Sequence, residues 1–281
     1  MSKVLIATEK PFAAPAVAGI KQILTEAGFE VVLLEKYTTK AELLAAVADV
    51  EAIIIRSDII DAEVFDAAKQ LKIVVRAGAG YDNVDLESAT AHGVCVMNTP
   101  GQNANAVAEL VFAMLLFCVR NRFNGTSGTE LKDKKLGLLA YGNTGRNVAR
   151  IAKGIGMDIY AYDPFTPAEV IEKEGVHAVA SQKELFSTCD IVSLHIPATP
   201  ETKGSIGREL VSLLPKKAIL VNTARKEIIN EPELIALLKE REDLRYLADI
   251  RPGAHEEFEA AAGERYFSTP KKMGAQTAEA N

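Results

Sequence analysis

Short runs of uninterrupted apolar residues alternate with helical stretches along most of the chain. A strand solvated on one face alternates apolar and polar residues, whereas a run that is apolar throughout predicts a strand covered on both faces, as in a parallel sheet. This alternation predicts an α/β fold. In the first part of the chain, strands are expected over residues 4–7, 31–34, 52–55, 73–75 and 94–97, and helices over 14–27, 40–47, 62–70 and 86–91.

A second series of the same kind follows one long helical stretch, residues 104–122, which a glycine-rich loop ends. The chain has 281 residues, more than one ordinary hydrophobic core organises. We therefore expect two Rossmann-like parallel-sheet domains with a cleft between them. The strands expected in the second series cover residues 136–140, 159–162, 191–195, 218–222 and 246–250.

The charge balance and the apolar pattern exclude some classes of function. The net charge is -6, and lysine and arginine are spread along the chain, so we expect no nucleic-acid partner. The longest apolar stretch, residues 107–119, contains Glu109 and is too short to span a bilayer, so we expect no membrane partner. The chain begins directly with a strand, which predicts a cytoplasmic protein without a signal peptide.

Three cysteines, Cys95, Cys118 and Cys189, show no metal-ligand spacing. Each lies among apolar residues, so we expect reduced thiols buried in the core, as in cytosolic proteins, and no metal site.

Residues 136–146 have the pattern of a strand, a tight turn and the start of a helix. The turn carries Ala140, Gly142 and Gly145 where a dinucleotide-binding fingerprint has three glycines. Gly142 would let the backbone approach a pyrophosphate, Gly145 would let the helix pack close to the strand, and the helix N-terminus would supply amide donors. Ala140 must either avoid a positive φ angle or tolerate strain.

Asp163 follows the next expected strand at about the offset at which such folds place a ribose-binding acid. A carboxylate there accepts hydrogen bonds from the ribose hydroxyls and repels a 2′-phosphate, which favours NAD over NADP. The alternative is an ordinary surface turn with an aspartate cap.

Three more segments carry ordered motifs: residues 76–86, residues 98–101 followed by 107–110, and residues 221–225. Together with the glycine turn, they resemble the D-2-hydroxyacid dehydrogenase family over essentially the whole chain. Residues 55–57 and the loop after Arg76 resemble the phosphoglycerate dehydrogenase branch of that family most closely, in the form without a regulatory domain.

The resemblance implies a particular domain arrangement. Residues 1–100 would form the substrate-binding (catalytic) domain, residues 101–275 the NAD-binding domain, and residues 276–281 the start of a helix that crosses back to the first domain. With no regulatory domain expected, feedback inhibition by serine through that domain is not expected either.

The resemblance also implies the cofactor and the substrate contacts. Arg225 would bridge the carboxylate and the carbonyl oxygen of the substrate, because a guanidinium is planar and always charged. Arg56 and Arg76 end parallel strands, where open α/β sheets bind ligands, and are the candidates for a substrate phosphate. Arg56 could instead be a solvated loop residue. The full sets are Gly142, Asn143, Thr144, Gly145, Asp163, His195, Thr223, Ala224, Arg225, Asp249 and Gly274 for NAD, and Arg56, Ser57, Arg76, Ala77, Gly78, Ala79 and Lys10 for the substrate.

Lys272 occupies the position at which the family usually has its catalytic histidine, and the usual glutamate partner after Asp249 is missing. We expect Lys272 to donate a proton to the carbonyl oxygen during reduction and to remove the hydroxyl proton during oxidation. Burial, Arg225, Lys271 and the oxidised nicotinamide would lower its pKa from about 10.4. Alternatives are His255 as the acid, or a surface lysine pair that only binds phosphate.

The expected activity is therefore NAD-dependent oxidation of 3-phospho-D-glycerate, the entry to serine synthesis. Two alternatives remain: another D-2-hydroxyacid dehydrogenase, such as a hydroxypyruvate or glyoxylate reductase, and a non-catalytic NAD-sensing protein. The resemblance to dimeric relatives favours a homodimer. One helix face is either core or part of a two-fold interface: Ala106, Leu110, Ala113, Met114 and Phe117.

Overall fold

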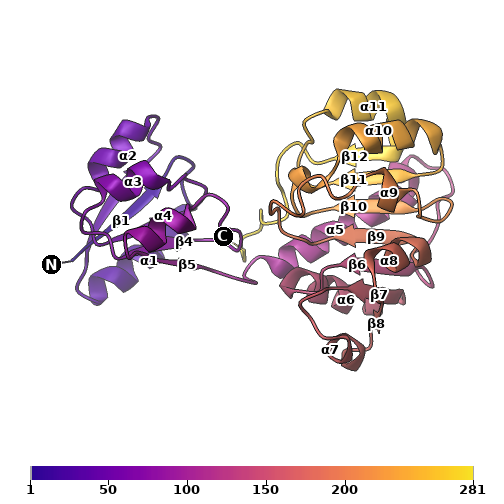
Figure 1. The fold of residues 1–281 in the computed structure, drawn as a ribbon, viewed down its shortest axis with the longest axis horizontal. Coiled ribbons are helices and arrows are strands. Elements are labelled where there is room, and N and C mark those ends of the chain that lie inside the picture. Colours follow the sequence, from indigo (N-terminus) through magenta and orange to yellow (C-terminus); the bar gives the residue numbers. More distant parts are fainter. Residues whose placement is uncertain (1, 281) are drawn as a thin grey trace. The chain divides into compact units, whose positions relative to one another are not determined.

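A computed structural model of the protein describes residues 2–280, which form two compact units, residues 2–103 and Ala104–Ala280. Each unit is built around one parallel sheet with helices between the strands, so the expected α/β class with two Rossmann-like domains is confirmed (Figure 1). Met1 and Asn281 lie outside the described residues, and Asn281 ends the expected crossing helix. Residues 277–280 form a turn, so that helix stays a prediction.

The first unit, drawn in indigo to purple in Figure 1, has a five-stranded sheet in the order β2-β1-β3-β4-β5. Every neighbouring pair in it is parallel. Its strands are β1 (Lys3–Thr8), β2 (Glu30–Glu35), β3 (Ala52–Ile55), β4 (Ile73–Arg76) and β5 (Cys95–Asn98), and its helices are α1 (Ala14–Glu26), α2 (Lys40–Ala46), α3 (Ala62–Ala67) and α4 (Leu86–Ala91).

Helix α3 ends at Ala67, earlier than the sequence pattern predicts. The Leu71 amide turns back to the Ala68 carbonyl at 3.1 Å, and the Lys72 amide donates to the Glu51 carbonyl at 2.8 Å. The helix must end there because the bond between Lys72 and Glu51 begins the pairing of β4 with β3.

Burial differs between the inner and outer strands of this sheet. All residues of β1 after Lys3 are buried, whereas β5 alternates exposed and half-buried residues. Cys95 begins β5 and is exposed, so the expectation of a core thiol is wrong for this residue. The reason is its place on an edge strand, which has a neighbour on one side only. Cys118 and Cys189 are buried, and burial raises the pKa of the Cys189 thiol to about 12.

The second unit has a seven-stranded sheet in the order β12-β11-β10-β9-β6-β7-β8. The chain runs outward from β6 in one direction, then returns to β9 on its other side, so β6 and β9 flank the point where strand order reverses. Open α/β sheets bind ligands at that point. The strands are β6 (Lys135–Leu139), β7 (Asp158–Tyr162), β8 (His177–Ala178), β9 (Ile191–Leu194), β10 (Ile219–Asn222), β11 (Arg245–Ala248) and β12 (Tyr266–Ser268).

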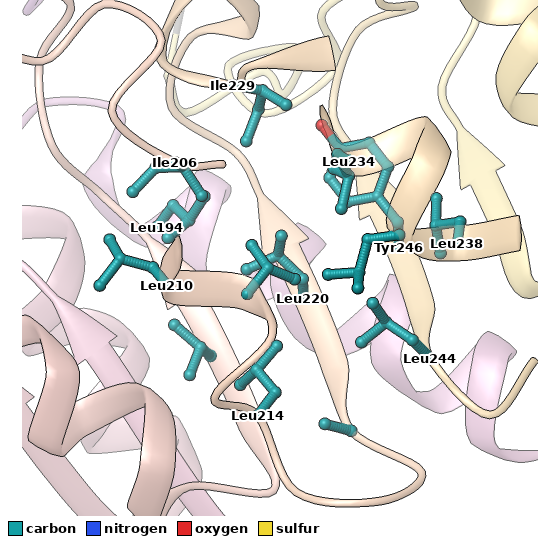
Figure 2. Close-up of a cluster of buried hydrophobic side chains, with 14 of the residues drawn as sticks. Leu194, Ile206, Leu210, Leu214, Leu220, Ile229, Leu234, Leu238, Leu244 and Tyr246 are labelled. Atoms are coloured by element: carbon teal, nitrogen blue, oxygen red, sulfur yellow. The ribbon is translucent and has the colours of Figure 1, made fainter. Parts of the chain in front are cut away.

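The helices of this unit cover both faces of its sheet (Figure 1). They are α5 (Ala104–Val119), α6 (Asn143–Ile155), α7 (Ala168–Lys173), α8 (Gln182–Thr188), α9 (Arg208–Val211), α10 (Glu231–Glu240) and α11 (His255–Ala262). Figure 2 shows part of the core on one face, where side chains of the strands interdigitate with those of neighbouring helices and loops: Leu194, Ile206, Leu210, Leu214, Leu220, Ile229, Leu234, Leu238, Leu244 and Tyr246.

Helix α5 ends at Val119, before the expected end at residue 122. Asn121, Arg122 and Phe123 all have positive φ angles, 49°, 56° and 58°, so they form a left-handed turn that a helix cannot include. The Arg122 guanidinium holds this turn by donating to the carbonyl of Tyr266 at 2.7 Å.

The apolar face of α5 has a mixed environment. Met114 is buried, whereas Ala113 is exposed and Ala106, Leu110 and Phe117 are half-buried. Among residues 2–280, no helix is long and apolar enough to cross a membrane.

Candidate active site

The glycine turn lies at the carboxyl end of β6 and leads into α6. Gly142 caps the helix, and the Arg146 amide donates to its carbonyl at 3.0 Å. A β-carbon at Gly145 would lie 2.5 Å from the Ala140 carbonyl oxygen, so only glycine allows the helix this close to the turn. A β-carbon at Gly142 would meet nothing within 4 Å, which leaves its backbone open to a ligand.

Ala140 adopts the strained one of the two backbone conformations that the sequence left open. Its φ angle is +80°, so it adopts the left-handed conformation that the family's glycine would take without strain. This conformation costs an L-residue about 1–2 kcal/mol. The turn therefore keeps the geometry of the fingerprint at some cost in stability.

Asp163 ties this turn to the end of β7. Its Oδ2 accepts from the Tyr141 amide at 2.7 Å, and its Oδ1 accepts from the Phe165 amide at 2.8 Å. The second bond is the aspartate-capped turn that was the alternative interpretation. A carboxylate has about four acceptor positions, so both oxygens keep capacity for ribose hydroxyls.

Two buried polar atoms at the ends of the adjacent strands have no hydrogen-bond partner among the described residues: His195 Nε2 after β9 and Thr223 Oγ1 after β10. Buried polar atoms without protein partners are rare, and a bound ligand or water supplies the missing hydrogen bond. Burial lowers the pKa of His195 to about 4, so its imidazole is neutral near neutral pH. These two atoms and the open glycine turn fit a dinucleotide with polar groups along its length.

Asn222 organises the loop that follows β10. Its side chain is buried, accepts from the Ala224 amide at 3.0 Å and donates to the Arg225 carbonyl at 2.9 Å. This fixes the backbone from which the Arg225 side chain extends.

Arg225 and Lys272 meet at one backbone carbonyl. Arg225 Nη1 and Lys272 Nζ each donate to the Ala224 oxygen at 3.5 Å. Hydrogen bonds of this length are at the weak limit, so the contacts locate the two groups without immobilising them. The two candidate catalytic cations, far apart in sequence, therefore lie in one place.

Asp249 fixes the segment that carries Lys272. Its carboxylate is buried and accepts from the Thr269 hydroxyl at 2.8 Å and from the amides of Met273 and Gly274 at 2.7 and 2.9 Å. The sequence analysis missed Thr269, which directly follows the short strand β12. The run Tyr-Phe-Ser-Thr at 266–269 is β-prone, but it is only a few residues long and gives no signal for the bond from Thr269 to Asp249.

His255, the alternative acid, has both ring nitrogens engaged elsewhere. Nδ1 lies 2.9 Å from the Tyr266 hydroxyl, and Nε2 lies 3.2 Å from a carboxylate oxygen of Glu259 on the same helix. Its contacts are with α11 and β12, whereas Lys272 contacts the loop that bears Arg225.

In the first unit, the predicted substrate residues lie at the carboxyl ends of β1, β3 and β4. The loop after β4 is held at the ends of β3 and β5: the Ala77 amide donates to Ile55, the Thr99 amide to the Gly78 carbonyl at 3.0 Å, and the Asn98 side chain to the Ala79 carbonyl at 2.7 Å.

Gly78 leaves room for the Arg76 side chain. A β-carbon at Gly78 would lie 1.3 Å from Arg76 Nη1, so the guanidinium occupies the space that any other residue would fill. Arg56 donates to the Pro11 carbonyl at 3.3 Å. Ser57 and Lys10 are both exposed.

A buried carboxylate that the sequence analysis missed, Asp58, supports this edge. It accepts from the amides of Glu9 and Arg56 at 2.7 and 3.1 Å and from the Tyr37 hydroxyl at 2.8 Å. It thus ties the end of β1, which leads to Lys10, to the segment that carries Arg56. Burial and then Asp58 raise the pKa of Tyr37.

Among residues 2–280, no cluster of three or more His, Cys, Asp or Glu side chains could hold a metal ion. The available chemistry at the strand ends of the second unit is a neutral imidazole, hydroxyls, backbone amides, two carboxylates and two cations.

Comparisons with known proteins agree on one family. Residues 113–262 match the family described as D-isomer specific 2-hydroxyacid dehydrogenase, NAD binding domain. The chain is similar to D-3-phosphoglycerate dehydrogenase of Methanocaldococcus jannaschii, with 39% identity over 216 residues, which are 72% of this chain and 41% of that protein. It is also similar to hydroxypyruvate reductase of Thermotoga maritima, with 36% identity over 219 residues, 73% of this chain and 70% of that protein.

A solved structure extends the similarity to nearly the whole chain. A crystal structure described as NAD+-bound 3-phosphoglycerate dehydrogenase of Entamoeba histolytica matches with a TM-score of 0.91 and 48% identity, covering 99% of this chain and 90% of that one. The chain nevertheless spans less than half the length of the Methanocaldococcus jannaschii relative.

Proposed function

This chain belongs to the D-isomer specific 2-hydroxyacid dehydrogenase family, and on that premise we propose that it oxidises 3-phospho-D-glycerate to 3-phosphohydroxypyruvate with NAD. The resemblance read from the sequence motifs is thus confirmed at the level of the family. The proposed activity is supported by the names of similar proteins, since the Methanocaldococcus jannaschii and Entamoeba histolytica proteins are both named as phosphoglycerate dehydrogenases. It would make the protein the entry enzyme of serine biosynthesis.

The observation that carries the proposal is the meeting of Arg225 and Lys272 at the Ala224 carbonyl. Oxidation of a 2-hydroxy acid needs a cation for the carboxylate and a base for the hydroxyl proton, and both must reach the same carbon. A guanidinium and an amine at one carbonyl supply this pair.

In the proposed reaction, the guanidinium of Arg225 binds the substrate carboxylate and the oxygen on C2. The uncharged amine of Lys272 takes the hydroxyl proton as the C2–O bond becomes a carbonyl, and returns that proton in the reverse direction. When bound, NAD accepts the hydride that leaves C2. The amine must be uncharged to accept this proton, so the proposed role requires Lys272 to be deprotonated when the hydroxyl proton leaves.

The NAD site that we propose is built on the open glycine turn, with the pyrophosphate over the N-terminus of α6. Asp163 would bind the ribose hydroxyls through its remaining acceptor positions, and His195 and Thr223 would gain partners for their buried polar atoms. The residues that we propose for NAD are Gly142, Asn143, Thr144, Gly145, Asp163, His195, Thr223, Ala224, Arg225 and Gly274. Asp249, which the sequence also placed at the cofactor, already accepts three hydrogen bonds from the protein.

The substrate phosphate would bind to the first unit, at Arg56 and Arg76, with Ser57 and Lys10 at the edge of the site. The amides of Ala77, Gly78 and Ala79, on the loop after β4, would offer hydrogen-bond donors to the substrate carboxylate. These assignments make residues 1–100 the substrate-binding domain and residues 101–275 the NAD-binding domain. We also propose that the protein is cytoplasmic and that it forms a homodimer. Sedimentation velocity tests the dimer directly.

The experiment is NAD-linked turnover across a panel of phosphorylated and unphosphorylated 2-hydroxy acids, followed by NADH absorbance. We expect 3-phosphoglycerate to give the highest kcat/KM. Equal or higher kcat/KM for glycerate would instead assign the protein to the hydroxypyruvate reductases, the second candidate, which the Thermotoga maritima relative supports. A protein that only senses NAD would bind the cofactor and form no NADH even at stoichiometric enzyme.

A further inference from the structure

The carboxylate of Asp249 and three donors from a single downstream segment form what we call the Asp249 clasp: Asp249, Thr269, Met273 and Gly274. Oδ1 accepts from the Thr269 hydroxyl at 2.8 Å and the Met273 amide at 2.7 Å, and Oδ2 accepts from the Gly274 amide at 2.9 Å. Asp249 is only 2% exposed. Lys272 lies in the chain between these donors, so the clasp encloses the residue assigned to proton transfer.

Gly274 is needed for the clasp to close. A β-carbon at this position would lie 2.9 Å from Asp249 Oδ2 and 3.0 Å from Val107 Cγ2. A larger residue would therefore push the Gly274 amide away from the carboxylate. The glycine keeps the segment close to the end of β11.

Ile250 shows that the backbone is strained on the other side of the clasp. Its φ angle is +96°, which a β-branched residue rarely adopts, and its amide donates to Thr269 Oγ1 at 2.7 Å. The Thr269 hydroxyl therefore accepts from Ile250 and donates to Asp249. Strain of this kind persists where the surroundings over-determine it, and it clusters at functional sites.

We infer that Asp249 and Thr269 are positioning residues that hold the Lys272 amine beside Arg225, an inference that rests on the proposed proton transfer by Lys272. The sequence placed Asp249 in contact with the cofactor. In the structure, three internal donors use most of the acceptor capacity of its carboxylate. All three partners are donors, so an ionised carboxylate satisfies them, whereas an asparagine amide would turn a donor toward one of them.

The first test measures kcat and KM separately for Asp249→Asn, Thr269→Val and Thr269→Ser. Misplacing a catalytic group by an ångström costs on the order of 100-fold in rate, so Asp249→Asn and Thr269→Val should lose about that much kcat while KM for NAD changes little. Thr269→Ser keeps the hydroxyl and should restore turnover close to that of the unmodified protein. The pH dependence of kcat should shift in the first two variants only.

Asp190→Asn is the matched control. Asp190 Oδ2 accepts from the Lys135 amide at 2.9 Å, at the amino-terminal edge of the sheet beside the starts of β6 and β9. The variant makes the same change of carboxylate to amide, away from the strand ends that carry the site. Its kcat should stay close to that of the unmodified protein.

A second readout does not need turnover. Acetic anhydride labelling of Lys272 across pH, read by peptide mass spectrometry, reports the titration of its amine directly. The labelling midpoint should move in Asp249→Asn and Thr269→Val and stay in place in Thr269→Ser and Asp190→Asn. An unmoved midpoint in Thr269→Val would overturn the inference, whatever its kcat. If the unmodified protein forms no NADH from 3-phosphoglycerate, the proposed function fails, and the labelling still decides whether the clasp positions Lys272.

Discussion

Arg225 and Lys272 share one acceptor, the carbonyl oxygen of Ala224, at 3.5 Å from each cation. Their segments are held separately, that of Arg225 by Asn222 and that of Lys272 by Asp249. Asn222 and Asp249 are themselves linked, since the Asp249 amide donates to the Asn222 carbonyl at 2.8 Å. At the ends of the adjacent strands β10 and β11, Asn222 therefore holds the segment of Arg225, and Asp249 holds the segment of Lys272.

Removal of the proposed phosphate-binding cations should change substrate preference. A hydrogen bond to a charged group contributes about 1.5–3 kcal/mol, so Arg56→Met or Arg76→Met should raise KM for 3-phosphoglycerate on the order of 10- to 100-fold. The kcat/KM for unphosphorylated glycerate should stay constant. Arg208→Met, which breaks a surface pair with Glu240, is the control. Equal losses for both substrates would mean that these arginines do not bind the phosphate.

Asp163 should set the choice of cofactor. Asp163→Asn keeps an oxygen acceptor for the Tyr141 amide but removes the charge that repels a 2′-phosphate. We expect the ratio of kcat/KM for NAD to that for NADP to fall by at least about tenfold, mainly through KM. A ratio that does not change would assign Asp163 to the turn alone.

His195 should make the protein less stable in mild acid. Its folded pKa is about 4 because of burial, below the unfolded value of about 6.5. The unfolded state therefore binds a proton first as the pH falls, and stability present above about pH 6.5 is lost progressively toward pH 4. The loss between neutral pH and about pH 5 should reach roughly 2 kcal/mol. Urea unfolding of the unmodified protein and of His195→Gln measures it, and parallel pH dependences for the two proteins would contradict the assignment.

The glycine turn gives opposite expectations for two substitutions. Gly145→Ala places a β-carbon against the Ala140 carbonyl and should lower the free energy of unfolding by about 1–3 kcal/mol, because this backbone contact cannot relax easily. Ala140→Gly removes the strain of the positive φ angle. This change should raise the free energy of unfolding by up to about 1 kcal/mol. Urea unfolding and NAD titration test both. A stable, NAD-binding Gly145→Ala protein would show that the close approach is not needed.

The strands could be predicted from the sequence wherever an uninterrupted apolar run was long enough to be recognised. The strands from β1 to β11 carry such runs, apart from β8. Strands β8 and β12, of two and three residues, are too short for a pattern. The end of α5 was placed too late because nothing in Asn121–Phe123 marks three consecutive left-handed residues. The exposure of Cys95 depends on its edge strand, which only the sheet order reveals.

The residues of the candidate site also differ in whether the sequence alone could identify them. Candidates such as Gly145 and Asp163 could be proposed because the glycine turn and the acid after the next strand have a recognisable spacing in one segment. Thr269 and Asp58 could not, because their importance comes from partners distant in sequence: Thr269 bonds Asp249, and Asp58 joins Glu9, Tyr37 and Arg56. The meeting of Arg225 and Lys272 likewise depends on the register of neighbouring strands.

The most direct measurement of the central claim is the pH–rate profile for 3-phosphoglycerate oxidation by the unmodified protein, Lys272→Ala and Lys272→Met. General acid–base catalysis contributes about 100- to 10,000-fold, so both variants should lose rate in that range and lose the ascending limb that reports deprotonation of the base, while NAD affinity is retained. Near-normal turnover with an unchanged profile would contradict the account and remove Lys272 from the mechanism.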